Sequence, residues 1–267
     1  MLTKLLKYEW KTTARVLLPI GGGVLGFTLI TSLVNHLLNG YEAWPQVAVW
    51  LQDLLNVATV LAWIFVLGAC VFLNVQRFYK LLGEQGYLML SLPVPLWKHI
   101  AVKLISACVW TGIAVLYLIL CGNMLSGSLF SFSGAGEPFF AARTVTDVTA
   151  LLFLAAFGVT AVAGAYLDFY LACAIGGQFG QQRLLASIIS YFILGFLEQI
   201  LATMVLILLM FGAVQMDSLW VVGFVHSLNS FWMMVAVMSG ILLLVVILDA
   251  IKWAVTQWLM TSRLNLV

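Results

Sequence analysis

Long runs of apolar residues, separated by short polar breaks, dominate the chain from residue 17 onwards. A transmembrane helix needs about 20 apolar residues, because each residue adds 1.5 Å and the hydrocarbon core is about 30 Å thick. Six runs meet that length, and they predict membrane-spanning helices at residues 17–37, 47–73, 101–123, 147–175, 184–212 and 229–256. The pattern therefore predicts an all-α membrane protein in which residues 1–267 form a single transmembrane domain.

The first 15 residues follow the pattern of an amphipathic helix. At 100° per residue, one arc of about 80° contains the four basic residues Lys4, Lys7, Lys11 and Arg15. Apolar side chains cover the opposite side, where Glu9 interrupts them and would need a partner. Residues 1–15 are therefore predicted to form an amphipathic elbow helix with its cations toward lipid phosphate. It acts either as a cationic anchor alone or also as a contact for a cytoplasmic subunit.

Composition narrows the class of protein further. Hydrophobic residues make up 64% of the chain and charged residues 8%, against about 25% charged in soluble domains. This excludes a soluble enzyme, a nucleic-acid-binding domain and a disordered chain. The four cysteines lie inside apolar runs without paired spacing, and the three histidines are isolated. The sequence therefore predicts neither a disulfide, a metal site nor a catalytic site.

The distribution of Lys and Arg predicts the orientation. With six spans, eleven of the twelve basic residues fall on one side of the membrane, and Arg143 alone falls on the other. Because basic residues collect in cytoplasmic loops, both termini are predicted to be cytoplasmic.

A carboxylate within an apolar run is costly unless it lines a cavity or finds a partner, and Glu198 and Asp168 are two such residues. Glu198 is 15 residues into the fifth run, about 22 Å along a helix and so near mid-membrane. Asp168 lies in the fourth run, nearer the cytoplasm. Both are candidates for a translocation pathway; the alternative is a buried hydrogen bond at a helix or subunit contact.

Two further pairs of polar residues are each three positions apart, a spacing that puts them on one helix face. Asp53 and Asn56 share a face in the second run and are also candidates for the translocation pathway. Asp249 and Lys252 lie at the inner end of the sixth run. This last pair is predicted to form a structural ion pair.

The cytoplasmic loop at 76–100 is too long for a minimal turn and too apolar for a solvated one. Gly83 and Gly86 bracket Glu84, and Pro93 and Pro95 break the helix further on. The loop is predicted to contain a short helix whose apolar side chains either enter the lipid or dock on another protein.

Within this loop, GEQGYLMLSLPVPLWKHIAVKLI at 83–105 resembles the corresponding loop of permease subunits of type-2 ABC exporters from Gram-positive bacteria. The residues that carry the resemblance are Glu84, Gly86, Tyr87, Leu88, Leu92, Pro93 and Val94. Weaker similarities occur at 5–19, 174–193 and 263–266, in the order typical of the family. The sequence departs from the pattern at Pro95, which follows the Leu-Pro-Val block.

The resemblance implies a dimer of six-span subunits in a bacterial cell membrane, formed with a second copy or a paralogue. Each subunit would bind a separate ATPase, which holds ATP and Mg²⁺, through a coupling helix in the loop. Glu84, Gly86, Tyr87 and Leu88 would face that ATPase. This chain would bind no cofactor and would not be an enzyme, since it has no G-x-x-x-x-G-K-[ST] motif.

Short outer loops favour a lipid-like, amphiphilic or peptide cargo. Two alternatives stay open. One is an ion-gradient-driven secondary transporter or channel that uses the intramembrane carboxylates, and the other is a membrane scaffold or sensor that does not transport.

Overall fold

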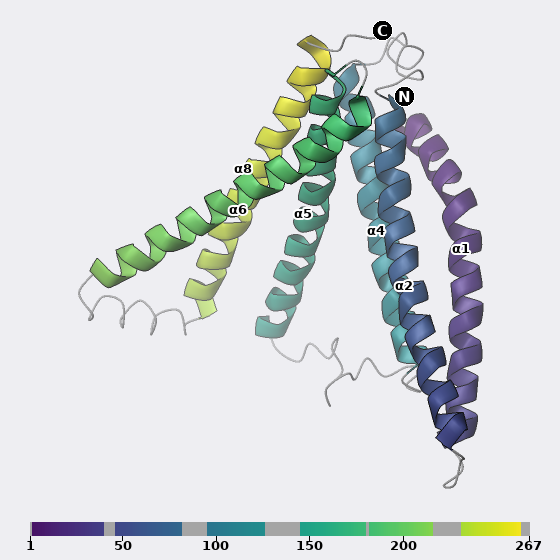
Figure 1. Cartoon of the computed structure of the whole chain (residues 1–267). Coiled ribbons are helices and arrows are strands. Elements are labelled where there is room, and N and C mark those ends of the chain that lie inside the picture. The colour runs from purple at the N-terminus through teal and green to yellow at the C-terminus, as the bar shows by residue number, and fades with distance from the viewer. Residues whose placement is uncertain are drawn as a thin grey trace. The chain divides into compact units, whose positions relative to one another are not determined.

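The computed structural model describes residues 2–39, 46–81, 95–125, 145–179, 182–215 and 231–262 (Figure 1). These residues form helices α1 (Leu2–Asn39), α2 (Gln46–Leu81), α4 (Leu96–Leu125), α5 (Val145–Gly176), α6 (Arg183–Gln215) and α8 (Phe231–Ser262). Each of the six is long enough and apolar enough to cross a membrane, and the described residues contain no strand. The predicted fold class, an all-α protein with six transmembrane helices, is confirmed.

Several helices extend beyond the apolar runs at the ends predicted to be cytoplasmic. α2 continues to Leu81, α8 continues to Ser262, and α4 begins at Leu96. The added residues mix polar and basic side chains with apolar ones and include no glycine or proline, so they continue a helix without needing the hydrocarbon.

α1 shows the same extension at its N-terminus. Residues 2–39 form one unbroken helix of 38 residues, so the predicted amphipathic segment is the beginning of α1 rather than a separate element. One face explains this continuity: Thr13, Leu17, Thr28 and Thr31 are all buried and fall within about 60° of one another. A bend between the amphipathic segment and the span would misalign this packed face.

The chain divides into two compact units. Unit 1 comprises residues 1–77 and 98–143 and contains α1, nearly all of α2 and most of α4. Its described core is centred on Leu17, Cys70, Trp110 and Ala114, which come from all three helices.

Hydrogen bonds between spans reinforce unit 1. The Thr31 and Thr59 hydroxyls lie 3.0 Å apart, and Trp63 Nε1 donates to Thr28 Oγ1 at 3.0 Å. Tyr117 donates to the backbone oxygen of Gly21 at 2.7 Å, which joins α4 to α1. Because lipid tails are as apolar as leucine, helices in a bilayer associate through close packing and bonds of this kind.

Unit 2 comprises residues 78–97 and 144–267, and in it α5 packs against both α6 and α8. The connection from α5 to α6 is very tight. A Cβ added to Gly176 would lie 2.6 Å from the backbone nitrogen of Ser187 and 2.8 Å from the backbone oxygen of Arg183. Gly176 therefore allows the end of α5 to touch the backbone of the first turn of α6, which sets where α6 begins.

Candidate functional site

Unit 2 contains a group of four charged side chains inside the membrane-spanning helices, here called the Lys252 cluster. Lys252 of α8 lies with its Nζ 2.7 Å from Asp168 Oδ1 of α5 and 2.7 Å from Glu198 Oε1 of α6. Asp249, one turn earlier on α8, has its Oδ1 4.0 Å from the same Nζ. A single ammonium group therefore joins α5, α6 and α8.

The arrangement brings together residues that counting along the sequence places at different depths. Glu198 is 15 residues from the start of α6, about 22 Å, whereas Asp168 is eight residues from the end of α5, about 12 Å. Figure 1 shows that α6 is strongly inclined relative to α5. Distance along the axis of α6 therefore overstates depth, and both carboxylates lie 2.7 Å from Lys252. The long Glu198 and Lys252 side chains cover the remaining gap.

Burial within the cluster is uneven. The side chains of Asp168, Asp249 and Lys252 are 19%, 14% and 18% exposed, whereas that of Glu198 is 43% exposed. Three carboxylates face one ammonium group, so the cluster has more negative than positive groups when all are ionised. A carboxylate within a membrane is costly without compensation, so each of the three depends on its closeness to Lys252, and Glu198 is the most accessible of them. The described residues contain no group of His, Cys, Asp and Glu arranged to hold a metal ion.

A glycine brings α5 and α8 close together beside this cluster. A Cβ added to Gly164 of α5 would lie 2.8 Å from Asp249 Oδ1, which is too close for an unmoved side chain. Gly158, on the same helix, has nothing within 4 Å of such a Cβ. Gly164 thus leaves the space that Asp249 occupies. Sequence reasoning missed this role, because small residues are common in membrane helices.

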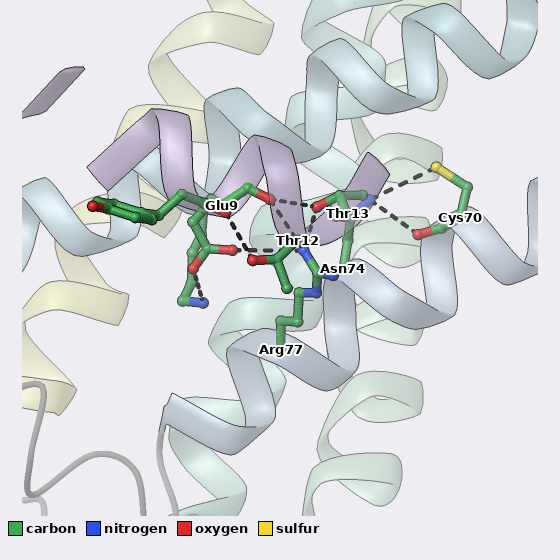
Figure 2. Close-up of polar contacts among 8 residues, drawn as sticks. Glu9, Thr12, Thr13, Cys70, Asn74 and Arg77 are labelled. Carbon is green, nitrogen blue, oxygen red and sulfur yellow. Dashed lines mark hydrogen bonds and ion pairs between the residues drawn. The ribbon is translucent and has the colours of Figure 1, made fainter. Parts of the chain in front are cut away.

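Unit 1 contains a second charged group, here called the Glu9 cluster (Figure 2). Glu9 Oε1 lies 2.8 Å from Lys103 Nζ of α4, and Glu9 Oε2 lies 3.7 Å from Arg77 Nη1 of α2. The same Arg77 nitrogen donates to the hydroxyl of Thr13 and, at 3.4 Å, to the backbone oxygen of Glu9. Glu9 was expected to need a partner on its apolar side, and that expectation is confirmed.

The Glu9 cluster connects the two helices on either side of the predicted coupling loop. Arg77 is four residues before the end of α2, and Lys103 is seven residues after the start of α4. Neither basic residue is prominent in the sequence except as part of the cytoplasmic charge count. Their common partner could be found only once α1 was known to lie against both helices.

The other two candidates for the translocation pathway, Asp53 and Asn56 of α2, lie in different surroundings. Asn56 is half-buried and accepts a hydrogen bond from Asn35 Nδ2 of α1 at 2.9 Å. Asp53, three residues earlier, is exposed. The structure therefore puts Asn56 in a helix contact and does not bring Asp53 into that contact.

The predicted ATPase-facing residues Glu84, Gly86, Tyr87 and Leu88 lie outside the described residues. Their predicted role stands on the sequence.

Comparison of the chain with protein-family models, with curated proteins and with solved structures gives no match.

Proposed function

We propose that this multi-pass membrane protein is the permease subunit of an ABC exporter that moves a lipid-like, amphiphilic or peptide cargo. A separate ATPase subunit supplies the energy, and the permease works as a dimer with a second copy or a paralogue. The protein resides in a bacterial cell membrane with both termini in the cytoplasm.

The observation that carries the proposal is the block from Glu84 to Val94 together with its position between α2 and α4. This block resembles the ATPase-contacting loop of type-2 exporters. The Glu9 cluster supports the assignment, since it ties both flanking helices to α1 close to the loop. Because α2 and α4 are both joined to α1, a push from a partner on the segment between them reaches three membrane helices.

The loop residues have distinct roles in this proposal. Tyr87 and Leu88 supply apolar docking area, and Gly86 allows the backbone to approach the ATPase closely. The Glu84 carboxylate pairs with a basic residue of the ATPase and fixes the orientation. ATP binding draws the two ATPases together, and each loop passes that movement to α2, α4 and, through Glu9, to α1.

The coupling role is tested by Glu84→Ala in membranes that contain the chain and the ATPase encoded by a neighbouring gene. ATP hydrolysis dependent on this chain is expected to fall, because the docked loop loses its orienting charge. Glu137→Ala, which removes a carboxylate from a predicted outer loop, is the matched control and is expected to have no effect. Equal hydrolysis in the two variants would contradict the assignment of Glu84.

A second candidate function is favoured by the Lys252 cluster. A secondary transporter needs intramembrane groups whose charge changes during the cycle, and three carboxylates around one lysine provide such groups. In this alternative, Glu198 exchanges its ion pair with Lys252 for a transported cation or proton, while Lys252 stays paired with Asp168, 2.7 Å away. No ATPase is then required.

Glu198→Gln separates the two candidates in proteoliposomes that contain the chain with an imposed proton gradient and no ATP. A secondary transporter is expected to move protons or cargo in the native form and to lose that movement in the variant. An exporter is expected to show no gradient-driven movement in either form.

A further inference from the structure

On the side of α1 that faces away from the rest of unit 1, basic residues and then leucines form one continuous stripe. Successive members are three or four residues apart, or seven across Gly22, so they follow one face of the helix. We call this the outward face of α1; it consists of Lys7, Lys11, Arg15, Leu18, Leu25, Leu29 and Leu33. All seven residues are exposed, with Leu18 at 65% and Leu33 at 60%.

The outward face is well separated from the packed face. At 100° per residue its centre lies roughly 130° around the helix from the centre of the buried residues Thr13, Leu17, Thr28 and Thr31. The basic residues on it are therefore not the ones that neutralise Glu9, which has Arg77 and Lys103 on its own side.

The position of the basic residues relative to the hydrocarbon core follows from the length of the uncharged segment after Arg15. Residues 16–38 contain no Lys, Arg, Asp or Glu and extend about 34 Å as a helix, enough to cross the hydrocarbon core of about 30 Å. Arg15 thus lies at the hydrocarbon boundary and Lys11 about 6 Å further out, within a headgroup layer roughly 5–8 Å thick. Lys7, about 12 Å out, lies just beyond the layer.

We propose that the outward face of α1 binds an anionic phospholipid. The phosphate is held by Arg15 and Lys11, with Lys7 adding attraction from outside, and the acyl chains lie along Leu18, Leu25 and Leu29. An Arg guanidinium suits phosphate because it donates two parallel hydrogen bonds, and Lys adds a mobile point charge.

The leucines distinguish lipid from an acidic protein surface as the occupant. An acidic protein in the cytoplasm could match the three cations but could not cover leucines about 4 to 27 Å below Arg15 inside the hydrocarbon. A phospholipid matches both parts at once, since its charge and its chains have the same order along the membrane normal. This inference is independent of whether transport is driven by ATP or by an ion gradient.

The test is native mass spectrometry of the purified full-length chain titrated with phosphatidylglycerol or with phosphatidylcholine of the same acyl chains. The native chain is expected to bind phosphatidylglycerol more tightly. Each basic residue near a charged membrane surface contributes about fivefold, so the double substitution Lys11→Gln with Arg15→Gln is expected to weaken phosphatidylglycerol binding on the order of 25-fold. Phosphatidylcholine binding is expected to change little.

Two controls sharpen the result. Lys11→Arg keeps the charge and is expected to retain the preference, whereas glycerol phosphate, which has the headgroup without chains, is expected to bind poorly. Equal binding of the two lipids, or an undiminished preference in the double variant, would overturn the proposal. So would binding of glycerol phosphate as tight as that of the lipid.

Discussion

Lys252→Met removes the one positive charge of the Lys252 cluster while keeping most of the apolar stem of the side chain. Two carboxylates then lose an ammonium group at 2.7 Å, and a third loses one at 4.0 Å. Removing one partner of a buried ion pair generally costs about 3–5 kcal/mol, because the remaining charge stays buried. Glu198 is 43% exposed, so we expect the lower end of that range, about 3 kcal/mol.

Because three carboxylates share one lysine, removing one carboxylate should destabilise the chain less than removing the lysine. Asp168→Asn leaves Lys252 with Glu198 at 2.7 Å, so its loss is limited to one charge-assisted hydrogen bond partly replaced by the amide oxygen, about 1 kcal/mol. Adding Asp168→Asn to Lys252→Met should restore stability relative to Lys252→Met alone, because it neutralises a carboxylate that has lost its partner. Lys252→Arg, which keeps the charge, should be the mildest change at position 252.

The assay is unfolding of the purified chain by titration with sodium dodecyl sulfate in mixed micelles, followed by far-ultraviolet circular dichroism. The free energy of unfolding should decrease in the order native, Asp168→Asn, Lys252→Met. If Lys252→Met were no more destabilising than Asp168→Asn, or if combining them gave the sum of their separate effects, Lys252 would not be the shared partner of these carboxylates.

Two further substitutions test other close contacts by the same unfolding assay. Gly176→Ala should destabilise the chain by about 1–3 kcal/mol, because its Cβ would meet backbone atoms of α6. The matched control Gly195→Ala has open space around it and should be neutral or stabilising by up to about 1 kcal/mol. A similar result for both variants would contradict the tight α5–α6 connection. Glu9→Gln should lower the free energy of unfolding by about 2 kcal/mol, because the Lys103 side chain, 9% exposed, loses its carboxylate partner. The control Lys11→Gln, on the exposed side of α1, should change it by less than about 0.5 kcal/mol. Equal effects would mean that the Glu9 cluster adds no stability.

The six helices could be predicted from the sequence because hydrocarbon thickness imposes a minimum apolar length on each. The end of the amphipathic segment could not, because a helical pattern in residues 1–15 is the same whether the next residue continues the helix or turns. What decides is the packing of Thr13 and Leu17 along one face of α1. The sequence predicts that Glu9 has a partner, because a carboxylate on an apolar arc needs one, but it does not indicate which residues those partners are.

The Lys252 cluster shows how far spacing can lead. Three-residue spacing predicts that Asp249 and Lys252 share a helix face, and their charged atoms lie 4.0 Å apart. The closer contacts of Lys252 with Asp168 and Glu198 depend on the inclination of α6 and on where α6 begins after Gly176. Residue spacing along the sequence predicts neither. The same spacing gave Asp53 and Asn56 a common face, but only Asn56 has a hydrogen bond to α1.

The most direct test of the proposed exporter function is affinity purification of the tagged full-length chain in mild detergent after co-expression with its genomic neighbours. We predict a stoichiometric ATPase with a phosphate-binding loop in the native preparation. It should be lost when residues 84–90 are scrambled and retained when residues 127–133 of the predicted outer loop are scrambled. A properly folded preparation that contains no ATPase would contradict the proposal and favour the gradient-driven transporter, with Glu198 as the next residue to test.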